Sequence, residues 1–378
     1  MTETHHHRIL HIVPRWNHGG PTTSVLTEAK IARQTGSGIH HQALTLEPGG
    51  SMKKVKEAIR YGVRLRSSPG AADEQALVHA ADAVVLHFWN TPSIWSFLDR
   101  WRDKPLRWIL HSQVNGMYRP QRLPPALART ACHVVLTSPH LQASIGHERV
   151  TVLPAVASLP DAPAKPWSAD SSKVMHAGTL NVFKLSPHFV PLHAGVSDPD
   201  HPTIVAGSGG DEQRFQDEAE SMGVAREFRW AGFSFDLPSL FDGARILSHP
   251  VSRFSYASSD IVIQESQAAG LPVLIQRDAP VAHLVRENLT GVFADDLVDF
   301  RAKLQAITAQ QYPLPDRRTV CEAALEDHDP VRKCGILNSI YRDVRDGPAR
   351  PVNDGFGTLE AWLAYQVGDA DEIVGARR

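Results

Sequence analysis

The sequence is poor in cysteine, has no long apolar run and carries almost no net charge. Its three cysteines, Cys132, Cys321 and Cys334, lie far apart, which excludes a disulfide framework and favours a reducing compartment. No apolar run reaches the length of a membrane-spanning helix, and the first residues, MTETHHHRILHIVP, are too polar for a secretory signal peptide. We therefore expect a cytoplasmic protein.

Charge and length narrow the class of protein further. A net charge of −2 argues against a nucleic-acid binder, because such proteins neutralise phosphates with a basic surface. The chain has 378 residues, more than one hydrophobic core usually holds, so we expect two domains. A proline-rich stretch without periodicity predicts the linker between them. The expected division is residues 1–158, a linker at 159–172, residues 173–347, and a tail at 348–378.

The first apolar run is followed by a glycine loop. Residues 9–13 predict a buried strand, Gly19 and Gly20 predict a tight turn, and a helix is expected from Thr22 to about Gln34. A strand, a glycine loop and a helix form a phosphate-binding arrangement. The signal is weak on its own, since most glycine pairs only turn the chain.

Two further predicted strands, at residues 83–87 and 107–111, each end in a histidine, His87 and His111. Open α/β sheets bind ligands at the carboxyl ends of their parallel strands. A single histidine in such a place is nevertheless more often structural than functional.

A basic stretch at residues 51–68 has six lysines and arginines and one glutamate, Glu57. A solvated basic helix is the favoured interpretation. The alternative is a surface for anionic acceptors or for peripheral contact with a membrane. The run His5, His6 and His7 could bind a metal incidentally, and we expect no functional role for it.

The most informative stretch is residues 255–273. Ser258, Ser259 and Asp260 are good N-cap residues, and the apolar run that follows predicts a helix ending at Gly270. A helix N-terminus suits a phosphate, because it gathers free N–H groups and partial positive charge. Glu265 lies about one and a half turns further and could accept hydrogen bonds from a ribose diol. The alternative is an ordinary solvated glutamate.

The segment ESQAAGLPV, from Glu265 to Val273, resembles the E-A-M-A-x-G-x-P-V block of family 4 retaining glycosyltransferases. The resemblance implies an α/β protein of GT-B fold, with two Rossmann-like doubly wound domains facing across a cleft. The first would be the acceptor side and the second would bind a nucleotide diphosphate sugar. The tail at 348–378 would pack back on the first domain. No metal and no cofactor are implied.

The resemblance extends to single residues of both domains. Gly19 and Gly20 match the glycine pair that faces the donor diphosphate, and His111 matches a histidine that contacts the donor sugar. Gly178 and Lys184 match a diphosphate-binding G-R-x-x-x-x-K motif in which Thr179 replaces the arginine. The remaining donor-binding residues implied in this way are Gly207, Phe233, Ser258, Ser259, Asp260 and Ile261.

One departure affects the functional prediction. The family carries a second glutamate eight residues before Glu265, where this chain has Ala257. We expect a retaining transferase of a hexose or deoxyhexose to an acceptor hydroxyl, with His111, Lys184 and Glu265 as its catalytic residues. The alternative is a degenerate GT-B protein that binds or scaffolds without turnover. The sugar, the base and the acceptor stay open.

Overall fold

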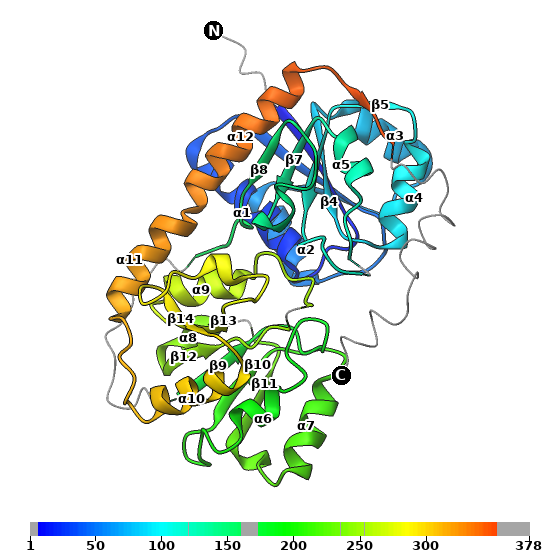
Figure 1. The fold of residues 1–378 in the computed structure, drawn as a ribbon. Helices are drawn as coiled ribbons and strands as arrows, with labels where there is room; N and C mark the ends of the chain where they lie inside the picture. The colour runs from blue at the N-terminus through cyan, green and yellow to red at the C-terminus, as the bar shows by residue number, and fades with distance from the viewer. Residues whose placement is uncertain (1–6, 120, 160–172, 235, 253, 354–378) are drawn as a thin grey trace. The chain divides into compact units, whose positions relative to one another are not determined.

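A computed structural model describes residues 7–119, 121–159, 173–234, 236–252 and 254–353 (Figure 1). The described chain divides into two compact units. Residues 7–158 and 329–353 belong to the first unit, and residues 159 and 173–328 belong to the second. Each unit contains one parallel sheet with helices, which confirms the predicted α/β class with two Rossmann-like doubly wound domains. The predicted linker, apart from Leu159, and residues 354–378 of the predicted tail lie outside the described residues.

The first unit is built on a seven-stranded sheet in the order β3-β2-β1-β4-β6-β7-β8, with every pairing parallel. Its central strands are runs of apolar residues buried on both faces, as a covered parallel sheet requires. The strands are β1 (His7–Val13), β2 (Ile39–Thr45), β3 (Arg64–Ser67), β4 (Ala83–Phe88), β6 (Trp108–Ser112), β7 (His133–Leu136) and β8 (Val150–Val152). Its helices are α1 (Gly20–Thr35), α2 (Met52–Tyr61), α3 (Ala71–Ala80), α4 (Pro92–Arg100), α5 (Pro125–Thr130) and α12 (Pro330–Asp346). A small antiparallel pair joins β5 (Pro105–Leu106) to β15 (Arg350–Pro351).

The second unit is built on a six-stranded sheet in the order β11-β10-β9-β12-β13-β14, and again every pairing is parallel. Its strands are β9 (Lys173–Ala177), β10 (Thr203–Ala206), β11 (Phe228–Gly232), β12 (Ala244–Ser248), β13 (Val273–Gln276) and β14 (Gly291–Ala294). Its helices are α6 (Phe189–His193), α7 (Glu212–Ser221), α8 (Leu237–Asp242), α9 (Ile261–Ala268), α10 (Leu297–Thr308) and α11 (Arg317–His328). Short 3-10 turns occur in the two units as η1 (Pro139–Leu141), η2 (Ala225–Glu227) and η3 (Ala282–Leu284).

The last described helix differs from the prediction, which placed residues up to 347 in the second domain. Helix α12 packs on α1 in the first unit instead. Its buried face contains Leu337, Ile340 and Tyr341, and the Tyr341 hydroxyl donates a 2.6 Å hydrogen bond to Glu28 Oε2. The amphipathic pattern shows which face is buried, but it does not show which domain receives it.

We expect Tyr341→Phe to lower the free energy of unfolding by about 1–3 kcal/mol, the cost of leaving a buried polar group unpaired. The reason is that the Glu28 carboxyl is itself buried, and burial raises its pKa to about 7 against the opposing effect of the Tyr341 hydrogen bond. Urea unfolding measures the change. Tyr312→Phe is the control, because Tyr312 packs only at the edge of the second unit's core. Equal effects of the two changes would contradict the prediction.

The basic stretch is helix for only part of its length. Helix α2 ends at Tyr61 because Gly62 adopts a left-handed conformation with φ +78°, and Arg64–Ser67 then forms the edge strand β3. The favoured single basic helix is therefore wrong for its second half. Among the described residues, no helix is both long enough and apolar enough to cross a membrane.

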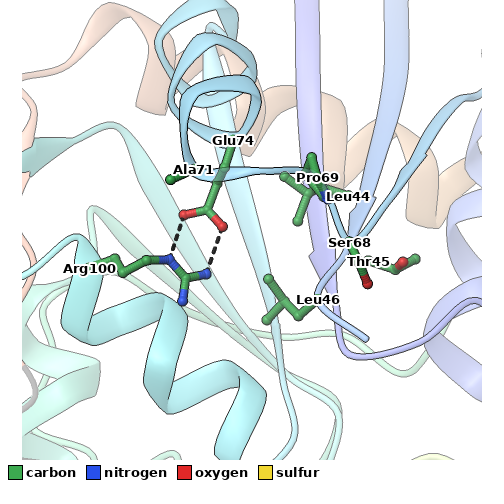
Figure 2. A pocket seen from close by; sticks show the side chains of 8 residues that line it. All are labelled: Leu44, Thr45, Leu46, Ser68, Pro69, Ala71, Glu74 and Arg100. Carbon is green, nitrogen blue, oxygen red and sulfur yellow. Dashed lines mark hydrogen bonds and ion pairs between the residues drawn. The ribbon is translucent and has the colours of Figure 1, made fainter. Parts of the chain in front are cut away.

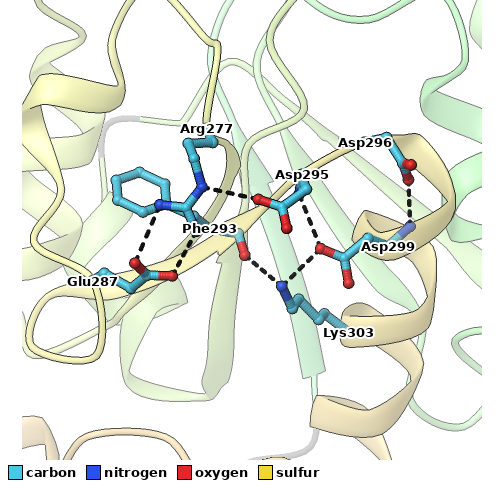
Figure 3. A network of polar contacts seen from close by, with 7 residues as sticks. All are labelled: Arg277, Glu287, Phe293, Asp295, Asp296, Asp299 and Lys303. Carbon is cyan, nitrogen blue, oxygen red and sulfur yellow. Dashed lines mark hydrogen bonds and ion pairs between the residues drawn. The ribbon is translucent and has the colours of Figure 1, made fainter.

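A polar network on the second unit ties β14 to α10 (Figure 3). Arg277 pairs with Glu287 at 2.8 Å and with Asp295 at 2.9 Å, and its guanidinium lies over the Phe293 ring. Lys303 bonds the Phe293 carbonyl at 2.8 Å. Arg277, Glu287 and Asp295 are solvent-exposed and pair with one another, so the network indicates a structural surface and not a ligand site.

Candidate functional site

The order of the strands marks the place for a ligand in the second unit. The sheet grows in opposite directions from β9 and β12, which are neighbours. Open α/β sheets bind ligands beyond the carboxyl ends of the strands at such a switch point. Here β9 leads directly to Gly178, and β12 leads directly to His249.

Two glycines let the loops after β9 and β10 touch. A Cβ on Gly207 would lie 1.8 Å from the Gly178 carbonyl oxygen, and a Cβ on Gly209 would lie 2.2 Å from that of Leu180. Gly178 and Gly207 also have φ of +149° and +153°, which side-chain-bearing residues rarely adopt. Both predicted glycines, Gly178 and Gly207, therefore shape the same loop pair at the switch point.

Lys184 lies in the loop after β9 and forms an ion pair with Asp260. The Lys184 Nζ is 2.9 Å from Asp260 Oδ1, and His249 Nε2 is 2.8 Å from Asp260 Oδ2. The backbone keeps Lys184 there, since its carbonyl accepts from Ser252 N at 3.0 Å. Two predicted donor-site residues, Lys184 and Asp260, are thus brought together.

Lys184 and Asp260 each stabilise the charged form of the other. Burial alone would raise the pKa of Asp260, but Lys184 and His249 hold it well below the ordinary value. Burial lowers the pKa of Lys184, and the charge of Asp260 together with Tyr256 more than compensates, so the net shift is upward. The site therefore keeps an ammonium and a carboxylate at neutral pH, both largely buried.

Two histidines of this cluster are not among the predicted residues. The rings of His176 and His249 stack with centroids 5.6 Å apart, and His176 Nδ1 bonds the Ser248 carbonyl at 3.0 Å. Neither His176 Nε2 nor His249 Nδ1 has a hydrogen-bond partner within the described chain. A Cβ on Gly178 would lie 3.8 Å from His176 Nε2, so the glycine leaves space above these rings. The available signal was a histidine at or next to the end of a strand, as for His87 and His111.

Helix α9 begins at Ile261, next to this cluster. Asp260 is its N-cap residue by position, yet its side chain makes no cap hydrogen bond, because it binds Lys184 and His249. Ser258 is buried, and the Ser259 hydroxyl accepts from Gln264 Nε2 at 3.1 Å. Glu265 lies half-buried further along α9. The structure thus confirms the predicted helix and its end at Gly270, with φ +77°.

The position of the missing glutamate, Ala257, lies in the hydrophobic core of the second unit. Ala257 is 3% exposed and packs in the cluster that includes Ile263 and Leu271. The predicted donor-binding residue Phe233 is by contrast 49% exposed, directly after Gly232, the last residue of β11. The carbonyl of Gly232 accepts from the Gly207 N–H at 2.8 Å, which joins the two loops.

The first unit has a corresponding glycine turn. Gly19 is the N-cap of α1 and Gly20 is its first residue, at the switch point between β1 and β4. The Gly19 N–H donates to Asn17 Oδ1 at 2.8 Å, and a Cβ on Gly19 would lie 2.9 Å from the same oxygen. The predicted arrangement of strand, glycine turn and helix is therefore present.

His111 is enclosed in the first unit. Its ring is 2% exposed and lies 5.1 Å from that of His87, and neither ring nitrogen has a hydrogen-bond partner among the described residues. Burial lowers the pKa of His111 to about 4, so the ring is neutral at physiological pH. Its contact with a donor sugar stays a prediction.

A pocket of about 340 Å³ opens at the carboxyl ends of β2 and β3 (Figure 2). Inside it, Arg100 and Glu74 form a two-pronged ion pair with contacts of 3.0 and 2.6 Å. Trp101 Nε1 donates a third hydrogen bond to Glu74, at 3.0 Å. Because these groups satisfy one another, the pocket offers no unpaired charge. It is lined by Leu44, Thr45, Leu46, Ser68, Pro69, Ala71, Glu74 and Arg100.

Comparisons with known proteins agree with this geometry. Residues 180–317 match the family model of the glycosyl transferases group 1. No curated protein sequence matches the chain significantly. The chain is similar to HepE from Anabaena, solved with UDP and glucose, at a TM-score of 0.67 and 16% identity, over 89% of this chain and 100% of that one.

Two further structures extend the likeness of fold. A glycosyltransferase from Rickettsia africae has a TM-score of 0.61 at 13% identity, over 90% of this chain and 99% of that one. A variant of S. aureus TarM, in complex with fondaparinux, alpha-GlcNAc-glycerol and UDP, has a TM-score of 0.67 at 9% identity, over 90% and 100%. The chain has the GT-B fold of these glycosyltransferases, and its residues 180–317 match the glycosyl transferases group 1 family.

Proposed function

We propose that this protein is a retaining glycosyltransferase of family 4 type, moving a hexose or deoxyhexose from a nucleotide diphosphate sugar to an acceptor hydroxyl. The observation that carries the proposal is the Lys184–Asp260–His249 cluster beside the N-terminus of α9. It combines an ammonium with helix N–H groups, which together suit a leaving diphosphate. It lies within the segment that matches the glycosyl transferases group 1 model.

Each residue of the cluster has a role in the proposed reaction. Lys184 takes up the charge that develops on the diphosphate as the sugar leaves, so no metal and no cofactor are needed for that step. Asp260 positions Lys184, and His249 holds Asp260 in place. Asp260 does not itself bind the anion, since a carboxylate repels phosphate. The acceptor hydroxyl attacks the face of the sugar from which the diphosphate departs, and a phosphate oxygen takes its proton.

The ligands bound in the similar structures support the choice of donor. HepE and TarM were solved with UDP, and HepE also with glucose. A uridine nucleotide sugar is therefore the first donor to test. A panel of nucleotide sugars, with released nucleoside diphosphate as the readout, tests the proposal directly.

We expect Glu265→Gln to weaken nucleotide binding by about 1.5–3 kcal/mol, because the ribose diol loses a charged hydrogen-bond acceptor. Titration calorimetry with UDP measures the effect. Glu220→Gln is the matched control, since Glu220 is an exposed glutamate on helix α7 of the same unit. Unchanged UDP affinity in a folded Glu265→Gln protein would remove Glu265 from the site.

A non-catalytic binding protein is the alternative, and two observations favour it. Ala257 is a core residue where the family has a glutamate, and Thr179 stands where the family has an arginine. Donor binding without release of nucleoside diphosphate would support this alternative. Turnover of a deoxyhexose donor would instead support a modified sugar pocket, since an alanine at 257 gives a sugar hydroxyl no hydrogen-bond partner.

The acceptor side is assigned to the first unit as part of the same proposal. We place the protein in the cytoplasm, with α2 as the surface for peripheral contact with the inner membrane face. Met52 and Ile59, seven residues apart on α2, are 69% and 73% exposed and lie among basic residues, as interfacial helices require. The acceptor would be a saccharide, a lipid-linked compound or a small molecule that offers a hydroxyl.

A further inference from the structure

Four buried histidines form a row across the first sheet. His41, His11, His87 and His111 lie on the neighbouring strands β2, β1, β4 and β6, and none is more than 4% exposed. His11 Nε2 is 2.9 Å from His41 Nδ1, and His11 Nδ1 is 3.0 Å from His87 Nε2. The Gln113 side-chain amide continues the row, 3.1 Å from His87 Nδ1. His11 is thus fixed between two imidazoles inside the core.

Helix α1 adds a carboxylate to one end of the row. One ring nitrogen of His11, one of His41 and one carboxylate oxygen of Glu28 lie within 4.8 Å of one another. Glu28 Oε2 accepts from Tyr341, but Glu28 Oε1 and His41 Nε2 are buried without a hydrogen-bond partner in the described part of the chain. Buried polar atoms are nearly always satisfied, so the unpaired Glu28 Oε1 needs an explanation, which an ion bound by these three side chains would supply.

We propose that His11, His41 and Glu28 form a buried site for one divalent transition-metal ion, of which zinc is the type. Two imidazoles and a carboxylate suit zinc or cobalt, whereas calcium and magnesium prefer oxygen ligands. Ligand atoms about 2.0 Å from a tetrahedral zinc lie roughly 3.3 Å apart. The 2.9 Å between His11 Nε2 and His41 Nδ1 is already close to that separation.

The row of hydrogen bonds can supply the tautomer that the metal needs. A metal on His11 Nε2 requires the proton on Nδ1, which then donates to His87 Nε2. His87 Nδ1–H in turn donates to the side-chain oxygen of Gln113, after that amide turns over to exchange its oxygen and nitrogen. Partners of this kind orient metal-bound imidazoles, and Tyr341 does the same for Glu28.

The proposed ion has a structural role that does not rest on the glycosyltransferase proposal. It would join β1, β2 and α1, which carry His11, His41 and Glu28. Those elements belong entirely to the first unit, while the candidate donor residues Lys184 and Asp260 belong to the second.

The test measures metal content. The protein carries His5→Ala and His6→Ala, so that the N-terminal histidine run does not contribute metal. It is treated with chelator, refolded with excess Zn²⁺ or Co²⁺ and desalted before elemental analysis and electronic absorption. We expect one ion per chain and a cobalt spectrum of low coordination number. Glu28→Gln and His41→Gln should each reduce the bound metal at least tenfold. His133→Gln, on the neighbouring strand β7, should retain the full equivalent.

Either of two results would overturn the proposal. One is that the chain with intact ligands binds no ion after refolding with zinc. The other is that Glu28→Gln and His41→Gln both retain a full equivalent, which would place the ion elsewhere. Glu28→Gln preserves the shape of the side chain and its acceptor for Tyr341, and circular dichroism confirms folding before the metal is counted.

Discussion

Acidification should unfold this protein above the pH at which most of its carboxyl groups titrate. Burial lowers the pKa of His41 to about 3 and those of His111 and His193 to about 4. Burial also lowers the pKa of His11, His87 and His176 well below the ordinary value. The unfolded chain binds protons at these histidines below about pH 6.5, and the folded chain does not. Their stabilising contribution is therefore complete above pH 6.5 and is lost as the pH falls towards the folded pKa values.

The expected size of this loss is large compared with the stability of a domain. At pH 5 a histidine whose folded pKa is about 3 or 4, such as His41, His111 or His193, contributes a loss of about 2 kcal/mol, because one pKa unit corresponds to about 1.4 kcal/mol. Among the described residues, the first unit has more histidines with a lowered pKa than the second, His133 included, so the first unit should unfold at the higher pH. Typical domain stabilities of about 5–15 kcal/mol place its midpoint near pH 5.

His111→Leu tests this explanation. Its ring nitrogens have no hydrogen-bond partner in the described structure, so leucine removes a titrating group without breaking a bond. We expect the acid midpoint of the first unit, followed by tryptophan fluorescence in chelator, to fall by about 0.4 pH unit. His201→Gln, at an exposed position, should leave the midpoint unchanged. A midpoint that does not move in His111→Leu would contradict the prediction.

Lys184→Met should reduce kcat/KM about 10²- to 10³-fold, the usual cost of removing one preorganised group from a developing negative charge. The reason is that methionine keeps most of the side-chain volume and removes the ammonium that faces the proposed diphosphate. Release of nucleoside diphosphate from the best donor measures the change. Lys173→Met is the matched control, at the start of strand β9, whose other end leads into the loop that carries Lys184.

Stability must be separated from activity in that experiment. In Lys184→Met, Asp260 loses its ion pair with Lys184 and keeps the contact with His249. A buried charge without a compensating partner is destabilising. The double change Lys184→Met with Asp260→Asn removes both charges. We expect it to fold normally and to stay as inactive as Lys184→Met. Wild-type kcat/KM in the double variant would remove Lys184 from the reaction.

The local pattern predicts much of this fold, because strands buried on both faces and helices with clear caps have strong signatures. The strand at 83–87 and the helix after Asp260 have the predicted type and nearly the predicted ends. The place of α12 was not predictable from its own residues, since it depends on a partner about 300 positions away, Glu28. The row of histidines could not be predicted either, because only the pairing of strands brings His41, His11 and His87 together.

The candidate site was predictable where the chain itself is contiguous. Gly178, Lys184 and Asp260 were found because each lies in a short motif. His249 and His176 were missed because their importance comes from the neighbouring position of β9 and β12 in the sheet, which a single sequence does not show. The order of strand, loop and helix predicts where a ligand binds. Which side chains surround Lys184 and change its pKa depends on the tertiary structure.

The return of α12 to the first unit has a consequence for synthesis on the ribosome. The described part of the second unit precedes residue 329, so all its described strands have emerged before Tyr341 does. The first unit begins earlier but is completed later, since Glu28 gains its hydroxyl partner only when Tyr341 emerges. During synthesis the first unit therefore stays incomplete, with the α12-binding face of α1 uncovered, while the second unit folds. A stop codon placed after residue 328 would leave that first unit permanently unfinished.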